Sequence, residues 1–300
     1  MSDPLRLRNV CIIAHVDHGK TTLSDNLLSS NQIINESLAG KLRYLDSRED
    51  EQEKEITMKS SSIALLHEDY EITQSIDNFF SRSEKSSTGK PSKSAELVID
   101  DSKEKIDYLV NLIDSPGHIE FNFEVTTGLK ACDGAILVVD VVEGVCSQTV
   151  TNLRKAIDEG LSIILVLNKI DKLVSELGLG DIEVHKHLLE LVDSVNAALS
   201  GALSARIIEE FGEKGEENED LLENLYQRHM LDPLRDNVIF GAAYDGWGFS
   251  LDDFTGIVAK KFGFKKDVVK NYLWGEFYYD VKNKKITTKP KTDDGKPMFV

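Results

Sequence analysis

Cysteine is scarce in this 300-residue sequence, which contains only Cys11, Cys132 and Cys146. An odd number of cysteines at such wide spacing predicts neither a disulfide framework nor a zinc site. We therefore interpret Cys11 and Cys132 as small apolar residues in a protein of a reducing compartment.

Long apolar runs are also lacking. No segment approaches the roughly 20 apolar residues that span a bilayer, and the first residues, Met1 to Pro4, contain no apolar signal core. We expect a soluble intracellular protein that has no membrane partner.

Basic residues are outnumbered, because 35 Lys and Arg stand against 52 Asp and Glu, for a net charge of -17. This balance argues against non-specific nucleic-acid binding by the chain as a whole, although a local basic contact with a larger assembly stays open. A chain of this length forms one large domain or two small ones.

A phosphate-binding loop is predicted between an apolar run and a helical stretch, in the segment Ala14-His15-Val16-Asp17-His18-Gly19-Lys20-Thr21. Loop N–H groups and a helix N-terminus can together bind an anion, and Thr22 belongs to the same turn. Gly19 allows close approach of the backbone, Lys20 supplies positive charge to the outer phosphates, and Thr21 can ligate Mg²⁺. The usual pattern has glycine at the position of Ala14, so an ordinary turn is the alternative.

Two further motifs each follow an apolar run: Asp114-Ser115-Pro116-Gly117-His118 and Asn168-Lys169-Ile170-Asp171. Asp114 can hold Mg²⁺ through water, and the Gly117 N–H can meet the terminal phosphate. Asp171 can accept both N–H groups of a guanine edge, whereas adenine offers no such pair of donors. Three such segments in this order predict a domain that binds GTP or GDP together with Mg²⁺.

Two other segments are expected to complete the site. Thr57 offers a hydroxyl that can reach Mg²⁺ when a third phosphate is bound, although it could instead be a threonine at the start of a strand. Ala242-Ala243-Tyr244 lies at the place for base stacking. We expect residues 31–59 to be mobile until the third phosphate binds, because little in the polar residues 49–54 repays the entropy of ordering.

The alternation of apolar runs and helical patterns predicts an α/β fold, with a doubly wound, mostly parallel sheet of the P-loop type. Ligands bind such sheets at the carboxyl ends of the strands, where all three motifs fall. The predicted strands are 8–14, 60–66, 105–113, 135–140, 162–168 and 237–241, and the predicted helices are 21–30, 118–131, 147–159, 250–262 and 265–273.

One nucleotide-binding domain is predicted over residues 1–275. It contains a mobile, serine-rich excursion at 72–105 and a helical and acidic insertion at about 183–235. Residues 276–300 are predicted to form a hairpin and the start of a following domain that is truncated.

The three motifs together resemble those of the translational GTPases. The segments Glu143-Gly144-Val145-Cys146-Ser147-Gln148-Thr149 and Gly246-Trp247-Gly248-Phe249 are similar to the elongation factor 2 group. Within that group, residues 38–48, residues 165–169 and Asp245 look closer to the elongation-factor-like GTPases of large ribosomal subunit maturation. The resemblance covers nearly all of residues 8–280, except 72–105 and about 209–232.

The resemblance implies a ribosome-stimulated GTPase that acts in the cytoplasm on the large ribosomal subunit. Its implied partners are the Shwachman–Bodian–Diamond protein and the anti-association initiation factor 6, which it would release. His118 is implied to orient the attacking water and, with Lys20, to be catalytic. Val16 and Ile56 are implied to form an apolar gate, and Asp17 to hold a monovalent cation.

Three departures from the family pattern are present: Glu55 stands for the usual glycine, Ala242 for serine and Glu120 for aspartate. One alternative is elongation factor 2 itself, in which the same chemistry drives translocation. Another is a nucleotide-binding scaffold that has lost turnover, although Lys20 and His118 argue against it. We expect a monomer.

Overall fold

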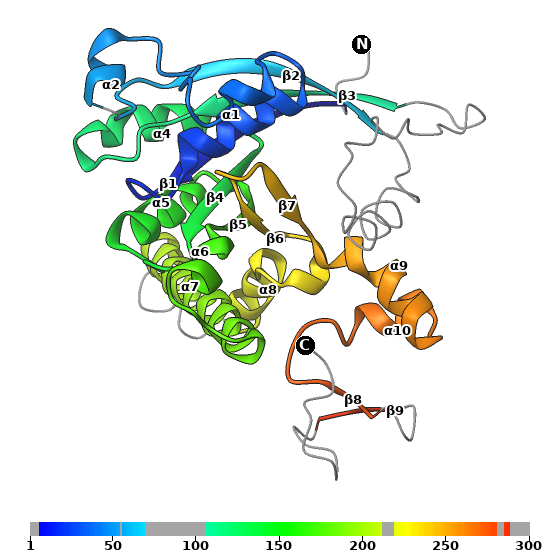
Figure 1. Cartoon of the computed structure of the whole chain (residues 1–300). Coiled ribbons are helices and arrows are strands. Elements are labelled where there is room, and N and C mark those ends of the chain that lie inside the picture. Colours follow the sequence, from blue (N-terminus) through cyan, green and yellow to red (C-terminus); the bar gives the residue numbers. More distant parts are fainter. Residues whose placement is uncertain (1–5, 55, 70–105, 212–218, 281–284, 289–300) are drawn as a thin grey trace, which may run out of the picture.

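The computed structural model describes residues 6–54, 56–69, 106–211, 219–280 and 285–288 (Figure 1). The predicted excursion at 72–105 and Glu55 lie outside the described residues, as does the end of the chain after 288. What the sequence predicts for these segments therefore stays a prediction.

A seven-stranded sheet forms the centre of the described chain. Its strands are β1 (Leu7–Ala14), β2 (Ser61–Asp69), β3 (Ile106–Asp114), β4 (Gly134–Asp140), β5 (Ser162–Asn168), β6 (Val238–Ala242) and β7 (Trp247–Phe249). They lie in the order β2-β3-β1-β4-β5-β6-β7, and only the edge strands β2 and β7 run antiparallel to their neighbours. The predicted mostly parallel α/β fold is confirmed.

Helices flank this sheet in Figure 1. They are α1 (Lys20–Ser30), α2 (Glu49–Lys54), α4 (Asn122–Lys130), α5 (Ser147–Asp158), α6 (Ile170–Ser175), α7 (Asp181–Phe211), α8 (Glu219–His229), α9 (Leu251–Phe262) and α10 (Lys266–Lys270). Short 3₁₀ turns occupy Glu36–Leu38, Ile119–Phe121 and Pro233–Arg235. A two-stranded pair, β8 (Tyr278–Asp280) with β9 (Lys285–Thr287), forms where a hairpin is predicted.

Successive side chains of the inner strands alternate between two separate cores. On β1, Cys11 and Ile13 pack in one core with buried residues of α4, α5 and α7. Ile12 and Ala14 pack in the other core with Leu28 of α1. Because both faces of the sheet are covered, the parallel strands have continuous apolar sequences.

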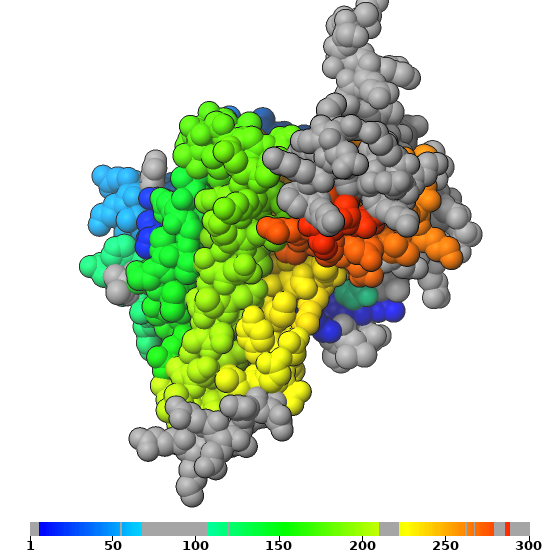
Figure 2. All heavy atoms as spheres, turned by 90° about the horizontal axis from the view of Figure 1, so that it is seen from below, coloured from blue at the N-terminus to red at the C-terminus, as the bar shows by residue number. Residues whose placement is uncertain are grey.

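Helix α7 forms the outer layer over α5, and Figure 2 shows it between the green α5 region and the yellow α8. Among the described helices it alone has the length and apolarity to cross a membrane, with a mean hydropathy of 1.2 over its most apolar 18-residue window. Leu188, Val195 and Leu199 of this helix are buried in the core that contains α5. Packing on the domain therefore accounts for the apolar character of α7.

Several local predictions are wrong. Residues 49–54 form α2, where no helix is predicted. The expected mobility of residues 31–59 without a third phosphate stays a prediction. Helix α7 falls in the helical and acidic insertion predicted at about 183–235. The predicted helix 118–131 is a 3₁₀ turn followed by α4, and the predicted helix 265–273 is the shorter α10.

The sequence predicts neither β7 nor α6, because both are too short to show a period. Strand β7 has three residues and pairs with β6, where Gly241 faces Gly248 and Ala242 faces Trp247. A Cβ on Gly241 would lie 2.8 Å from the Trp247 carbonyl oxygen. The missing side chain thus allows the close pairing of this edge.

Candidate functional site

Residues 14–21, called the P-loop here, connect β1 to α1 at the carboxyl edge of the sheet. They border a cavity of about 150 Å³. It is lined by His15, Val16, Asp17, Gly19, Lys20, Thr21 and Thr22, by Arg43, Ile56 and Thr57, and by Gly117 and His118. Three segments that are distant in the sequence therefore meet around one space.

The conformation of the P-loop leaves backbone donors available. Asp17 and Gly19 adopt left-handed φ values of 62° and 94°, and a Cβ on Gly19 would lie 2.2 Å from Asn168 Nδ2. No side chain caps the start of α1, so the N–H groups of its first turn can bind an anion. This geometry suits a phosphate group.

Lys20 and Asp114 form a buried ion pair beside the cavity. Lys20 Nζ lies 2.7 Å from Asp114 Oδ1 and 3.2 Å from Thr57 Oγ1. Burial raises the pKa of the Asp114 carboxyl, and the Lys20 ammonium partly offsets that rise. The ammonium is therefore held by two side chains at the place expected for contact with phosphates.

Oxygen atoms suited to Mg²⁺ converge near this ion pair. The hydroxyl oxygens of Thr21 and Thr57 are 3.5 Å apart. Asp114 Oδ2 is one of three buried side-chain atoms, within the described ranges, that have no hydrogen-bond partner. Hydroxyl and water-bridged carboxylate oxygens fit this ion, which when bound would neutralise charge on the phosphates.

Buried carboxylates hold the segment that carries Thr57. Asp46 Oδ1 accepts the Thr57 hydroxyl at 2.8 Å. Glu51, 1% exposed, accepts the backbone N–H groups of Met58 and Lys59 at 2.8 and 2.9 Å. One acidic side chain of residues 49–54 therefore ties α2 to the chain before β2, a contact that the sequence does not predict.

His118 lines the same cavity as Val16 and Ile56. Its side chain is 36% exposed, and Nδ1 accepts the Glu120 backbone N–H at 3.3 Å. The other ring nitrogen has the chemistry to bind a water molecule. The structure thus places His118 and the two residues of the implied gate around one cavity.

The third motif ties the sheet edge to the P-loop. Asn168 Nδ2 donates to the His18 carbonyl at 2.8 Å, and Asn168 Oδ1 accepts the Ala243 N–H at 2.9 Å. Lys169 Nζ donates to the Asp17 carbonyl at 2.7 Å and pairs with Asp140 Oδ2 at 2.6 Å. These contacts hold the predicted base-binding segments against the predicted phosphate-binding segment.

The residues predicted to meet the base lie outside the 150 Å³ cavity. Asp171 is half-buried in the first turn of α6, and Tyr244 is 77% exposed. Ala242 and Ala243 are buried at the end of β6. Ala14 is also buried, at the end of β1, and does not line the cavity.

His18 is fully buried and does not line the cavity. Its Nδ1 accepts the Asp140 backbone N–H at 3.2 Å, and Nε2 lies 3.2 Å from Glu143 Oε2. Burial, and then the neighbouring His15, lower the pKa of this imidazole. The His18 backbone carbonyl accepts the Asn168 hydrogen bond that ties the P-loop to β5. The ring contacts the turn after β4 and supports the loop without lining the cavity.

Sequence reasoning missed Arg43, Asp25 and Asp46. Arg43 lines the cavity, and its Nε donates to Asp46 Oδ2 at 2.7 Å. Asp25 accepts the backbone N–H groups of Arg43 and Tyr44, at 2.9 and 3.0 Å. Burial raises the pKa of the Asp25 carboxyl. Polar residues in a polar run give no signal of burial, so nothing in the sequence marks these anchors.

This arrangement can bind a phosphate chain and stabilise charge on it. An uncapped helix start, an ammonium, hydroxyl oxygens and the imidazole of His118 surround one space. Such a set needs no covalent step, because phosphoryl transfer is accelerated mainly by positioning and electrostatic stabilisation.

Several known proteins are similar in sequence to this chain over nearly its whole length. Elongation factor-like GTPase 1 of Homo sapiens is 41% identical over 310 aligned residues, covering 98% of this chain and 25% of that protein. Ribosome assembly protein 1 is 43% identical in Schizosaccharomyces pombe over 297 residues, with 98% and 26% covered. Its Saccharomyces cerevisiae counterpart is 43% identical over 305 residues, with 99% and 25% covered.

The chain spans about a quarter of the length of these relatives. The model of the elongation factor Tu GTP binding domain matches residues 5–270, which include all three motifs. The predicted resemblance is confirmed: the chain belongs to the elongation factor Tu GTP-binding domain family, and among known proteins it is similar to the elongation-factor-like and ribosome assembly GTPases.

Proposed function

We propose that this chain is the GTP-hydrolysing domain of a cytoplasmic protein that acts on the large ribosomal subunit during maturation. The ribosomal particle stimulates hydrolysis, and the reaction, with the Shwachman–Bodian–Diamond protein, releases the anti-association initiation factor 6. Support comes from relatives named ribosome assembly protein 1 and elongation factor-like GTPase 1. These events concern a whole protein, of which the chain covers a quarter of the relatives' length.

The observation that carries the proposal is the shared cavity of Lys20, Thr21, Thr57 and His118. Lys20 spreads charge from the outer phosphates, and Thr21, Thr57 and Asp114 hold Mg²⁺. His118 orients the attacking water once the ribosome repositions its ring. A histidine that depends on an outside contact for its position explains why hydrolysis by the isolated domain is expected to be slow.

The proposal includes a monovalent cation that Asp17 holds near the phosphates. Its carboxylate belongs to a residue that lines the cavity, and oxygen ligands near phosphates attract such ions. A requirement for potassium over a large organic cation, measured as nucleotide affinity, supports this element, whereas equal affinity in the two salts removes it.

Two other functions make different predictions. Elongation factor 2 would use the same site for translocation on whole ribosomes. A scaffold that binds nucleotide without turnover would follow from the departures at Ala14 and Ala242. The intact cluster of Lys20, Thr57 and Asp114 favours hydrolysis over the scaffold.

The deciding experiment compares GTP turnover by the 300-residue chain with isolated large subunits and with whole ribosomes. Maturation predicts stronger stimulation by isolated large subunits. Stronger stimulation by whole ribosomes favours translocation, and binding of GTP without turnover in either mixture favours the scaffold.

A His118→Ala variant tests the mechanism in the same assay. We expect GTP binding to change little and stimulated turnover to fall by about 10²–10⁴-fold, the usual cost of losing a proton-handling or positioning group. His67→Ala, an exposed histidine on β2, is the matched control. Normal turnover by His118→Ala would remove the assigned role.

A further inference from the structure

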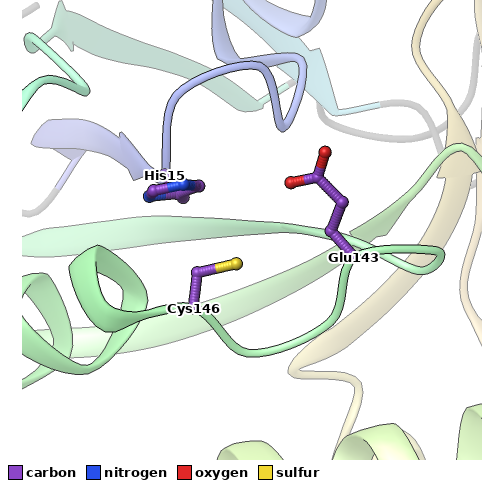
Figure 3. A group of neighbouring side chains, drawn as sticks. All are labelled: His15, Glu143 and Cys146. Atoms are coloured by element: carbon purple, nitrogen blue, oxygen red, sulfur yellow. The ribbon is translucent and has the colours of Figure 1, made fainter.

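A second cluster of metal-binding side chains lies beside the P-loop. His15 comes from the P-loop itself, and Glu143 and Cys146 come from the turn between β4 and α5. One ligand atom from each lies within 4.8 Å of the other two. Figure 3 shows the imidazole, the carboxylate and the thiol around the same gap.

We propose that His15, Glu143 and Cys146 form a binding site for a borderline-soft divalent transition metal ion of the Zn²⁺ type. Thiolate, imidazole and carboxylate are all ligands of Zn²⁺, whereas Mg²⁺ takes oxygen ligands almost alone. Three protein ligands leave a fourth position for water. This site therefore differs in chemistry from the Thr21, Thr57 and Asp114 oxygens.

The unpaired nitrogen of His15 is the first observation that favours an ion. His15 Nδ1 is buried and, among the described residues, is one of three buried side-chain atoms that have no hydrogen-bond partner. Leaving such a group unsatisfied costs free energy. The ring is also packed at 73° against the ring of His18, with 5.2 Å between their centroids. An ion bound through Nδ1 would give this nitrogen the partner that it lacks.

The position of Glu143 is the second observation. Its Oε2 lies 3.2 Å from His18 Nε2. Because the Asp140 N–H donates to His18 Nδ1, the neutral His18 ring carries its proton on Nε2 and donates it to Glu143. A hydrogen bond that orients a carboxylate ligand is the usual support of a metal site. His18 is thus a positioning residue and not a ligand.

Cys146 supplies the soft ligand. It stands at the N-cap of α5, and its Sγ lies 3.7 Å from His18 Nε2. On binding, a sulfur–metal bond forms, the S–H bond breaks, and the proton passes to solvent, with no change of oxidation state. Bonds of about 2.0–2.3 Å place tetrahedral ligand atoms roughly 3.3–3.6 Å apart, so shifts of about 1 Å close the observed arrangement.

The consequence of such a site is a link between two parts of the chain. An ion held by His15 and by the turn after β4 would join the P-loop to the start of α5. Wide spacing hides this site from the sequence, because its single cysteine stands more than a hundred residues from its histidine.

The test is a titration of the 300-residue chain with CoCl₂ and with ZnCl₂, without nucleotide or Mg²⁺. We expect one ion per chain, thiolate-to-cobalt charge-transfer absorption in the near ultraviolet, and displacement of cobalt by zinc. Cys146→Ser should abolish the absorption and weaken zinc binding by more than the roughly 10–100-fold that loss of a supporting residue costs.

Glu143→Gln gives a second test at a side chain that is 49% exposed and tolerates change. It should weaken zinc binding while the circular dichroism stays unchanged. Cys132→Ser is the matched control and should retain both stoichiometry and absorption. Absence of the charge-transfer band in the unaltered chain, or equal zinc affinity of Cys146→Ser and the unaltered chain, would overturn the site.

Discussion

At the scale of single residues, Asp171 is predicted to select guanine over other bases. Its carboxylate, half-buried in the first turn of α6, can only accept hydrogen bonds. Asp171→Asn presents an amide, which matches the edge of xanthine better than that of guanine. We expect the variant to lose affinity for GDP and gain affinity for xanthosine diphosphate.

Competition titrations with a fluorescent nucleotide measure both affinities of Asp171→Asn. Asp245→Asn, an exposed aspartate in the turn before β7, is the matched control. If Asp171→Asn keeps the preference for guanine, a different residue reads the base.

Residue types at the three motifs could be predicted because each has a chemical task at a strand end. Lys20, Asp114 and Thr57 do lie together in the structure. The supporting residues could not be predicted in the same way. Asp46 and Glu51 lie in a charged run. Their burial depends on donors that the fold brings there, the Thr57 hydroxyl for Asp46 and backbone N–H groups for Glu51.

At the scale of elements, α2 depends on one carboxylate. The Glu51 carboxylate accepts hydrogen bonds from backbone N–H groups before and after α2, from Arg48 at 3.1 Å and from Met58 at 2.8 Å. Glu51→Gln removes the charge and turns one acceptor into a donor. We expect a loss of about 1–3 kcal/mol in the free energy of unfolding and faster hydrogen exchange at residues 43–59.

Exposed Glu53 offers the control for this change, since Glu53→Gln alters the same charge on the same helix. Hydrogen exchange and denaturant unfolding are measured for both variants. Similar protection at residues 43–59 in Glu51→Gln and Glu53→Gln would contradict the anchoring role.

Elements of the inner sheet are predictable because their apolar runs are long and are bounded by turns. Strand β5 matches its predicted residues 162–168, and Ser250 caps α9 with Asp253 as expected of a helix start. The short elements are not predictable in this way. Strand β7 relies on the close pairing that Gly241 permits, and α2 relies on hydrogen bonds from Glu51 to backbone N–H groups that follow the helix.

At the scale of the whole molecule, one buried and two half-buried histidines give stability a dependence on pH. Burial is the first cause that lowers the pKa values of His18, His185 and His229 below 6.5. The unfolded chain then binds more protons than the folded chain just below that pH. Their contribution to stability is present above pH 6.5 and is lost as pH falls through the lowered values.

His185 isolates one part of this effect, since it lies on α7 with its ring against Trp274. The limiting slope is about 1.4 kcal/mol per pH unit for each proton. We expect His185→Gln to reduce the slope of unfolding free energy below pH 6.5, measured by urea titration. Asp25 and Asp114 have raised pKa values, so their effect on the free energy of unfolding has the opposite sign at lower pH. Both chains contain these residues, so their contribution cancels in the comparison. Unchanged slopes would contradict the assignment.

Guanine-nucleotide binding by the whole domain is tested most directly by equilibrium titration of the 300-residue chain with GTP, GDP and ATP in Mg²⁺. We predict saturable binding of one GTP or GDP per chain. ATP should bind on the order of 10⁴-fold more weakly, as at sites that reject a ligand lacking the matching donors. Equal binding of ATP and GTP, or no binding of either guanine nucleotide, would contradict the account.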